Sequence, residues 1–177
     1  MRRQGFTLVE LMIVIAIIAV IAAIATPSLL RNKLEANQTS AVVSLRAIAA
    51  GQTLWHKNDY DHNDVADYVA DYSQLYYAEV NAETVKIIDK ALADARGTGG
   101  AAKSGYLFGD LATGANGTAY EVQYEFGHNA WPAVYNRSGL QVFVIDTTGA
   151  VYQRDLGSDG SVYFADYPDT AAWMAVQ

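Results

Sequence analysis

The sequence predicts an α+β protein in which one long N-terminal helix packs on a small antiparallel β-sheet head. Three observations predict this architecture. Residues 6–25 are apolar except for Thr7 and Glu10. Residues 30–55 then repeat apolar side chains at three- and four-residue steps. From Gly105 onward, short runs of β-branched and aromatic residues alternate with turn residues, which is typical of strands.

The first half of the helix, residues 6–26, is long enough to cross a membrane. Twenty helical residues at about 1.5 Å each span roughly 30 Å, the hydrocarbon thickness of a bilayer. Glu10 is the one charge in this stretch. A carboxylate at membrane depth costs about 2.5–3.5 kcal/mol, and such groups are usually paired or functional. Residues 6–26 are therefore predicted to form a transmembrane or assembly helix in which Glu10 has a specific role.

The second half of the helix, residues 27–58, is predicted to be its amphipathic continuation. Pro27 falls inside the helical pattern and predicts a bend rather than a stop. One face of this half carries the periodic residues Leu30, Leu34, Gln38, Ala41, Leu45, Ile48, Gln52 and Trp55. We therefore expect one helix from Phe6 to about Lys57, with this face packed on the head.

The remainder divides into residues 59–104, predicted as a loop with short helices, and residues 105–177, predicted as the β-sheet head. In the first part, Val85, Ile88 and Leu92 lie at helical steps. The head should contain three to five strands. Its candidate strands are residues 106–111, 120–126, 131–135, 141–147, 150–156 and 161–164, with a hairpin turn at 147–149.

Charge divides the chain into a basic stem and an acidic head. The net charge is −7, but residues 1–58 carry +4 and residues 59–177 carry −11. An acidic head argues against a nucleic-acid partner. Two arginines precede the apolar run, which predicts a cytoplasmic N-terminus, a single membrane pass and an exported head. The chain has no cysteine, so the head depends on core packing without disulfides.

The stretch Gly5-Phe6-Thr7-Leu8-Val9-Glu10-Leu11-Met12-Ile13-Val14-Ile15 resembles the processing signal of the type IV pilin and type II secretion pseudopilin superfamily. The resemblance implies that residues 1–5 are a leader that a prepilin peptidase removes after Gly5. It implies that Phe6 becomes the N-methylated terminus and that Glu10 takes part in filament assembly. Pro27 lies where these proteins usually have a helix-bending proline.

Physical chemistry supports the implied role of Glu10. In a bundle of apolar helices an ionised carboxylate is tolerated only beside a positive partner. Cleavage after Gly5 creates an α-amine at Phe6, about one helical turn from Glu10 on the same face. The amine of the same or a neighbouring subunit can neutralise the acid. An uncleaved leader should accordingly leave Glu10 unpaired.

The head carries a second, less specific resemblance to pilin-like proteins. Its pattern runs Gly105-Tyr106-x-Phe108, then Trp131-Pro132, then Ser138-Gly139, then Phe143-Val144-Ile145-Asp146 with Gly149. This pattern implies a sheet module and assigns no binding residues. The absence of cysteine departs from pilins with a disulfide-closed loop, and leaves pilus and pseudopilus subunits both open.

No cofactor is required by the pattern, although calcium is a candidate ligand. Major pseudopilins of type II secretion bind calcium in a C-terminal loop, and carboxylate oxygens suit that ion. The candidate ligands here are Asp155, Asp159, Asp166 and Asp169. Their spacing matches no defined motif, so ordinary polar turns are the favoured interpretation.

Other readings of the N-terminus compete with the pilin-like one. The stretch Ala22-Ala23-Ile24-Ala25 could mimic a secretory cleavage site, but the apolar run is longer than such a signal requires. Arg2 and Arg3 could belong to a twin-arginine export signal. A plain single-pass anchor that is neither cleaved nor assembled also remains open.

The sequence therefore predicts a structural subunit rather than an enzyme. The three histidines have no nucleophile motif, metal-ligand spacing or nucleotide fingerprint near them. The resemblance implies identical or related pilin-like subunits, a prepilin peptidase and methylase, and an inner-membrane assembly machinery as partners. It implies a bacterial inner-membrane location with a periplasmic head, followed by a pilus or pseudopilus filament. The alternative is a membrane-anchored periplasmic binding module that does not polymerise.

Overall fold

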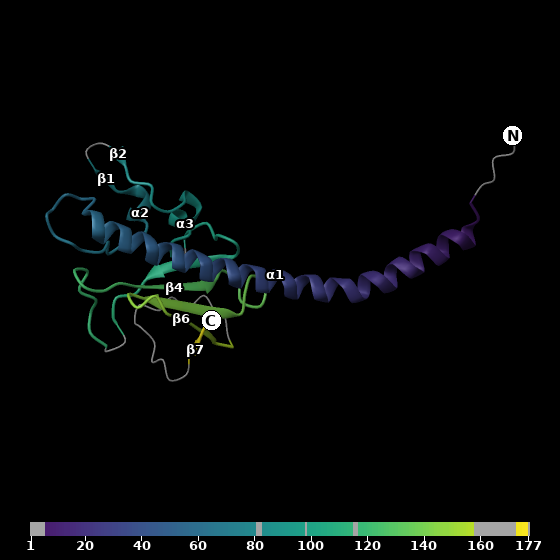
Figure 1. The fold of residues 1–177 in the computed structure, drawn as a ribbon. Coiled ribbons are helices and arrows are strands. Elements are labelled where there is room, and N and C mark those ends of the chain that lie inside the picture. Colours follow the sequence, from purple (N-terminus) through teal and green to yellow (C-terminus); the bar gives the residue numbers. More distant parts are fainter. Residues whose placement is uncertain (1–5, 81–82, 98, 115–116, 158–172, 177) are drawn as a thin grey trace.

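A long helix crosses a compact head and projects well beyond it (Figure 1). The computed structural model describes residues 6–80, 83–97, 99–114, 117–157 and 173–176. Within these residues the architecture is α+β, with the helix packed on an antiparallel sheet, as the sequence predicted.

Helix α1 (Leu8–Asn58) begins and ends at recognisable caps. Thr7 caps its start, and Asp59 ends it in the left-handed conformation, with its N–H bonded to the Trp55 carbonyl. The observed bounds lie within two residues of the predicted ones. The helix continues through Pro27, and Figure 1 shows its purple N-terminal part inclined to the blue part, as a bend without a stop requires.

Short elements connect α1 to the sheet. They are α2 (Gln74–Tyr77), β1 (Glu79–Val80), β2 (Glu83–Thr84) and α3 (Lys90–Asp94), with β1 and β2 forming an antiparallel pair. Helix α3 is shorter than the apolar pattern from Val85 to Leu92 suggested. It begins only after Asp89, whose carboxylate accepts a hydrogen bond from the Leu92 N–H and so fixes the first turn.

The head is built on a five-stranded sheet whose strands follow one another in chain order, all antiparallel. The strands are β3 (Tyr106–Asp110), β4 (Gly127–Pro132), β5 (Gln141–Asp146), β6 (Val151–Asp155) and β7 (Met174–Ala175). Strands β5 and β6 form the predicted hairpin, with Gly149 at a φ of 77° in its turn.

One strand prediction was wrong, one was partly right, and one falls outside the described residues. Residues 120–126 alternate in the sequence, yet they form a turn in which the Tyr124 N–H bonds the Glu121 carbonyl. The strand lies instead at β4, which is buried on both faces and therefore shows no alternation. The extended piece predicted at 131–135 overlaps β4 at Trp131 and Pro132 only. The predicted strand at 161–164 lies outside the described residues, and β7 was not predicted.

The sheet separates two apolar clusters. The larger one packs α1, α2 and α3 against one face of the sheet, to which Phe108, Phe143 and Ile145 contribute. The smaller one covers the other face with Trp131, Val142, Val144 and Trp173 among its members. The α1 residues that are buried in the head are Ala41, Val42, Ser44, Leu45, Ile48, Gly51, Gln52 and Trp55. The predicted face is thus confirmed from Ala41 onward, whereas Leu30 lies on the projecting part.

Candidate functional site

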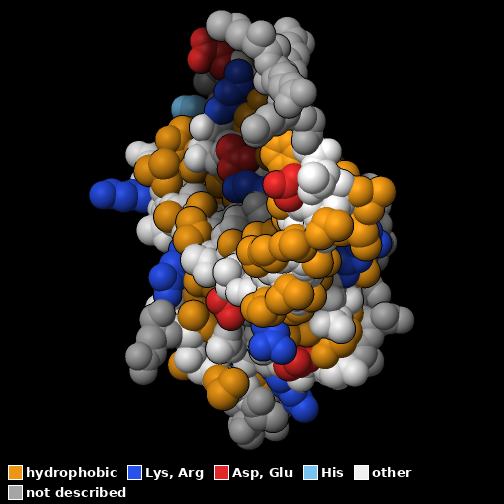
Figure 2. Space-filling model, turned by 90° about the vertical axis from the view of Figure 1, so that its right-hand side faces the viewer, with side chains coloured by type: hydrophobic (Ala, Val, Ile, Leu, Met, Phe, Trp, Pro, Cys, Tyr) orange, Lys and Arg blue, Asp and Glu red, His pale blue; other side chains and the backbone are white. Residues whose placement is uncertain are grey.

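The projecting half of α1 is an uncovered apolar surface. Every large hydrophobic side chain from Leu8 to Leu30 is between 48% and 74% exposed, and Phe6 is 88% exposed. Figure 2 views the molecule from the projecting end, where orange side chains gather on the face toward the viewer. By length and composition, α1 can cross a membrane. A helix that is apolar on all sides requires either lipid or other helices around it.

Thr7 and Glu10 form a capping box at the start of this surface. The Thr7 N–H and hydroxyl both donate to Glu10 Oε2, at 2.9 and 2.7 Å, and the Glu10 N–H donates to Thr7 Oγ1 at 3.2 Å. The Glu10 carboxylate is therefore hydrogen-bonded within its own chain. These bonds supply no positive charge, so the expected pairing of Glu10 with an amine stays a prediction. The signal was present in the sequence as Thr-x-x-Glu ahead of an apolar run.

The predicted processing and assembly residues occupy different positions relative to this box. Gly5 lies outside the described residues. Phe6 immediately precedes the cap, so an amine created there would stand at the positive end of α1. Pro27 lies far along the helix. Pro27 cannot donate to the Ala23 carbonyl, and the neighbouring Thr26 hydroxyl donates to the Ala22 carbonyl at 2.8 Å.

A buried polar network holds the second half of α1 in the head. Gln52, fully buried, pairs with the backbone of Val69: its Nε2 donates to the Val69 carbonyl and its Oε1 accepts from the Val69 N–H, both at 2.9 Å. Because this pairing orients the amide, its second N–H points to His128 Nε2, 3.1 Å away. Nδ1 of His128 then carries the proton and donates to Asp110 Oδ1 at 3.1 Å.

The network continues from Asp110 to the segment around Tyr72. Asp110 Oδ1 accepts from the Tyr72 N–H at 3.0 Å, and Asp110 Oδ2 lies 3.4 Å from Arg96, which also pairs with Asp71 at 2.9 Å. Burial, and to a lesser extent the Asp110 charge, raises the pKa of Tyr72, so its hydroxyl remains a neutral donor to the Leu92 carbonyl. The segment from Val69 to Tyr72, Asp110 on β3 and His128 on β4 are thus linked to the face of α1 that carries Gln52. Sequence periodicity placed Gln52 on that face but gave no partner for it.

The calcium candidates are only partly described. Asp155 is an exposed side chain that accepts hydrogen bonds from the Tyr135 hydroxyl and the Gly157 N–H, both at 2.9 Å. Asp159, Asp166 and Asp169 lie outside the described residues. Within residues that are described, no three His, Cys, Asp or Glu side chains are grouped so as to hold a metal ion. Calcium binding at the C-terminal loop stays a prediction.

Comparison with protein families divides the chain into two matching regions. Residues 1–26 match the family model described as the prokaryotic N-terminal methylation motif. Residues 23–169, more than half of the chain, match the model described as "Protein of unknown function (DUF2950)". The first region includes the predicted leader, the capping box and most of the uncovered apolar surface.

Two curated relatives are similar to a part of the chain. One is the type IV major pilin protein PilA of Myxococcus xanthus, 38% identical over 66 residues, which are 37% of this chain and 30% of that protein. The other is the type IV wide pilus major component PilA4 of Thermus thermophilus, 42% identical over 65 residues, which are 36% of this chain and 50% of that protein.

The chain thus spans half or less of the length of these relatives. No solved structure matches the head or the whole chain. The chain belongs to the DUF2950 family over residues 23–169, and its N-terminal methylation motif together with the pilin similarity supports the type IV pilin and pseudopilin superfamily.

Proposed function

We propose that this protein is a non-catalytic structural subunit of a type IV pilus. The observation that carries the proposal is the uncovered apolar half of α1. This half begins at the hydrogen-bonded carboxylate of Glu10 and projects from a head that has its own buried core. Such a surface can lie in a bilayer before assembly and in a bundle of identical helices after assembly. The relatives are named as major pilus components, which favours the pilus over a secretion pseudopilus.

Processing would prepare this surface for assembly. A prepilin peptidase would cut after Gly5 and methylate the new terminus at Phe6, leaving a positive amine next to the Thr7–Glu10 capping box. The two hydrogen bonds from Thr7 lower the cost of carrying Glu10 into an apolar bundle, and the amine supplies the compensating charge. Before assembly the subunit would lie in the inner membrane with its head in the periplasm, since the basic residues precede the apolar run.

Intact mass and N-terminal sequencing of the protein from its native membrane or from sheared filaments test processing. We expect a chain that begins at Phe6 and is heavier by one methyl group. A chain that begins at Met1 would leave only a membrane anchor. A chain that begins near Thr26 would indicate a secreted head, and either result would overturn the proposal.

A membrane-anchored binding module is the second candidate, because a lone apolar helix of this length also suits a single-pass anchor. Replacing Glu10 by Leu separates the two functions. A pilus subunit should lose filament assembly while its amount in the membrane stays unchanged. An anchor should insert as well or better, because the substitution removes a charge from the bilayer.

Pilus and pseudopilus subunits are separated by deletion of the protein. Loss of extracellular filaments with normal export of secreted enzymes would support the pilus. Loss of export without a change in surface filaments would instead assign the protein to a type II secretion pseudopilus.

A further inference from the structure

The end of the head from which α1 projects carries exposed basic side chains. Arg31 and Lys33 follow directly after the uncovered apolar surface of α1, and both are exposed. Arg137 is exposed on the loop between β4 and β5. The Asn37 amide donates to the Ser138 carbonyl at 2.7 Å, which holds this loop against α1 about one turn beyond Lys33. We call Arg31, Lys33 and Arg137 the basic collar.

The basic collar is not neutralised by nearby acids. None of its three cations forms an ion pair with a residue that the structure describes. Glu35 is two residues beyond Lys33 on α1. Asp155, at the end of β6, accepts a hydrogen bond from the Tyr135 hydroxyl of the same loop at 2.9 Å, and its neighbour Arg154 is exposed. The collar and Arg154 thus set four cations against two acids, and Figure 2 shows Lys and Arg side chains beside the hydrophobic ones at this end.

The opposite end of the head has the reverse charge. Residues 59–67, which follow α1, contain four aspartates and no Lys or Arg. The end of α1 at Asn58 lies about 38 Å along the helix from Lys33. Although residues 59–177 carry a net charge of −11, the head is therefore basic where the stem leaves it and acidic at its far end.

Position along α1 places the basic collar at the surface of a bilayer. Phe6 and Lys33 are 27 residues apart, which is about 40 Å of helix. A bilayer with its polar headgroup layers is about 40–45 Å thick. When the apolar surface lies in the hydrocarbon layer, the collar is level with the lipid phosphates. Side chains on a helix lean toward its N-terminus, so Arg31 and Lys33 lean back toward the membrane.

We infer that the basic collar binds the phosphates of an anionic phospholipid surface and so holds the head on the membrane. The inference rests on the membrane step of the proposed function and does not depend on filament assembly. Arginine and lysine side chains both donate strong, charge-assisted hydrogen bonds to phosphate oxygens. The acidic far end is directed away from the same surface, which adds to the preference for this orientation.

A contact of this kind is reversible, because exposed charges are screened by salt. The collar would orient the head while the subunit waits in the membrane, and it would release the head without any unfolding. Raised salt should therefore weaken the contact, whereas the apolar surface of α1 should stay in the bilayer.

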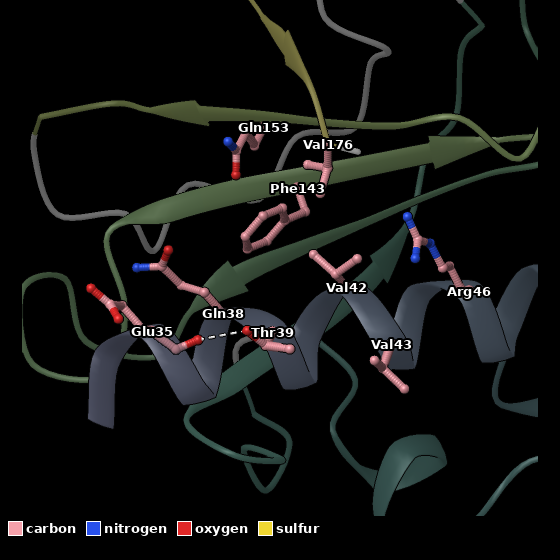
Figure 3. Close-up of a pocket in the computed structure, with 9 residues that line it drawn as sticks. All are labelled: Glu35, Gln38, Thr39, Val42, Val43, Arg46, Phe143, Gln153 and Val176. Carbon is pink, nitrogen blue, oxygen red and sulfur yellow. Dashed lines mark hydrogen bonds between the residues drawn. The ribbon is translucent and has the colours of Figure 1, made fainter. Parts of the chain in front are cut away.

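Arg46 and Lys57 provide a matched control on the same helix. Both are exposed, and neither forms an ion pair within the part of the chain that the structure describes. Glu35 and Arg46 lie at opposite ends of a groove of about 350 Å³ between α1 and the sheet, as Figure 3 shows. Arg46 is about 22 Å farther along α1 than Arg31, and Lys57 is farther still, so neither reaches the lipid phosphates.

Fluorescence quenching in lipid nanodiscs tests the contact, because the natural chain has no cysteine to compete for a label. The full-length protein with Val134→Cys, at a 51% exposed residue of the collar loop, is labelled in nanodiscs of phosphatidylethanolamine and phosphatidylglycerol that contain headgroup spin labels. Val65→Cys, at a 40% exposed residue near the far end of α1, is the reference position. Ile17→Cys with acyl-chain spin labels reports insertion of α1.

We expect quenching at position 134 to exceed that at position 65 about threefold or more, since phosphates and spin labels share the headgroup layer. Combined Arg31→Gln, Lys33→Gln and Arg137→Gln should remove the difference, as should high salt. Combined Arg46→Gln and Lys57→Gln should leave it unchanged. The charge-preserving set Arg31→Lys, Lys33→Arg and Arg137→Lys should also keep it, which separates loss of charge from damage to the fold.

Several results would overturn the contact with lipid. They are equal quenching at positions 134 and 65, quenching that survives neutralisation of the collar, and equal quenching in nanodiscs of phosphatidylcholine. Loss of quenching on addition of inorganic phosphate at constant ionic strength would indicate a site for free phosphate instead. Normal quenching at position 17 would leave the proposed function intact in each of these cases. Absence of quenching at position 17 would overturn membrane insertion and, with it, the proposed function.

Discussion

The Gln52 amide nitrogen on α1 lies 3.1 Å from His128 Nε2 on β4, inside the main core. Both side chains are at most 1% exposed, and each has its other polar atoms engaged by Val69 or Asp110. This contact joins residues 76 positions apart and fixes the rotation of the stem helix against the sheet. Removing one partner leaves several buried polar groups unsatisfied.

We predict that Gln52→Leu lowers the free energy of unfolding by about 2–4 kcal/mol, because the Val69 backbone pair and His128 Nε2 all lose a partner in the core. Thermal unfolding of the detergent-solubilised protein, followed by circular dichroism, measures the change. Thr53→Ala is the neighbouring control, since Thr53 is exposed and its hydroxyl donates to the Ala49 carbonyl of its own helix. Equal midpoints for the two variants would mean that the network does not stabilise the docking of α1.

Gly139 and Tyr106 explain part of the head pattern that resembles pilin-like proteins. A Cβ at residue 139 would stand 2.1 Å from the Tyr106 hydroxyl oxygen, and the Tyr106 ring is fully buried. The hydroxyl donates to the Gln141 carbonyl at 2.9 Å, so the ring cannot turn away freely. The glycine is thus required by the close approach of an aromatic side chain.

Gly139→Ala should therefore destabilise the head by about 1–3 kcal/mol through overpacking. The shift in the thermal unfolding midpoint measures it. Gly99→Ala is a suitable comparison, because a Cβ there meets no heavy atom within 4 Å. An unchanged midpoint for Gly139→Ala would show that Tyr106 and its strand move aside at little cost.

The sequence predicted those parts of the fold that show a helical repeat or a hairpin turn. Helix α1 shows the helical repeat from Ala41 to Trp55, and β5 and β6 are joined by a turn with Gly149. Strand β4 was missed because a strand buried on both faces has no alternation to detect. The misassigned strand at 120–126 has the alternation but folds as a turn.

The candidate site was predicted in the same uneven way. Glu10 was identified from its isolation in an apolar run, but its bond to Thr7 requires the helix to begin at that residue. The partners of Gln52 depend on contacts between distant segments. No local pattern of residues encodes contacts of this kind, so they became visible only in the folded chain.

The Asp89 carboxylate should make the stability of the head sensitive to acid. It accepts hydrogen bonds from the Leu92 N–H and from Lys103, each at 2.9 Å. Burial alone would raise the pKa of Asp89, but Lys103 and the α3 backbone lower it more, so the pKa lies below its usual value. A depressed pKa in the folded state adds stability above the unfolded pKa of about 3.9, and this stability is lost as the pH falls through the folded pKa.

We predict that Asp89→Asn flattens the fall in thermal midpoint below about pH 4. At pH 7 it should lower the free energy of unfolding by less than about 1 kcal/mol, since asparagine also caps helices. Asp64→Asn, a change of the same kind at an exposed loop residue, is the control. Identical acid profiles for the natural protein and Asp89→Asn would contradict the assignment.

The capping box predicts a graded role for Thr7 in assembly. Thr7→Val removes the hydroxyl that donates to Glu10 Oε2 and accepts from the Glu10 N–H, but keeps the donation from the Thr7 backbone. The helix start should lose about 1 kcal/mol, the usual value of an N-cap. We therefore expect a several-fold fall in the yield of sheared filaments, smaller than the loss with Glu10→Leu, and recovery with Thr7→Ser.

Intact mass of each Thr7 variant is needed beside the filament yield, because Thr7 is close to the proposed cleavage site. A variant that is cut normally and still assembles poorly would locate the defect in the capping box. Full assembly of Thr7→Val, together with loss of assembly in Glu10→Leu, would mean that Glu10 acts only through the amine of another subunit. The intramolecular bonds from the Thr7 hydroxyl would then serve the isolated subunit alone, and would be exchanged for contacts between subunits when the filament forms.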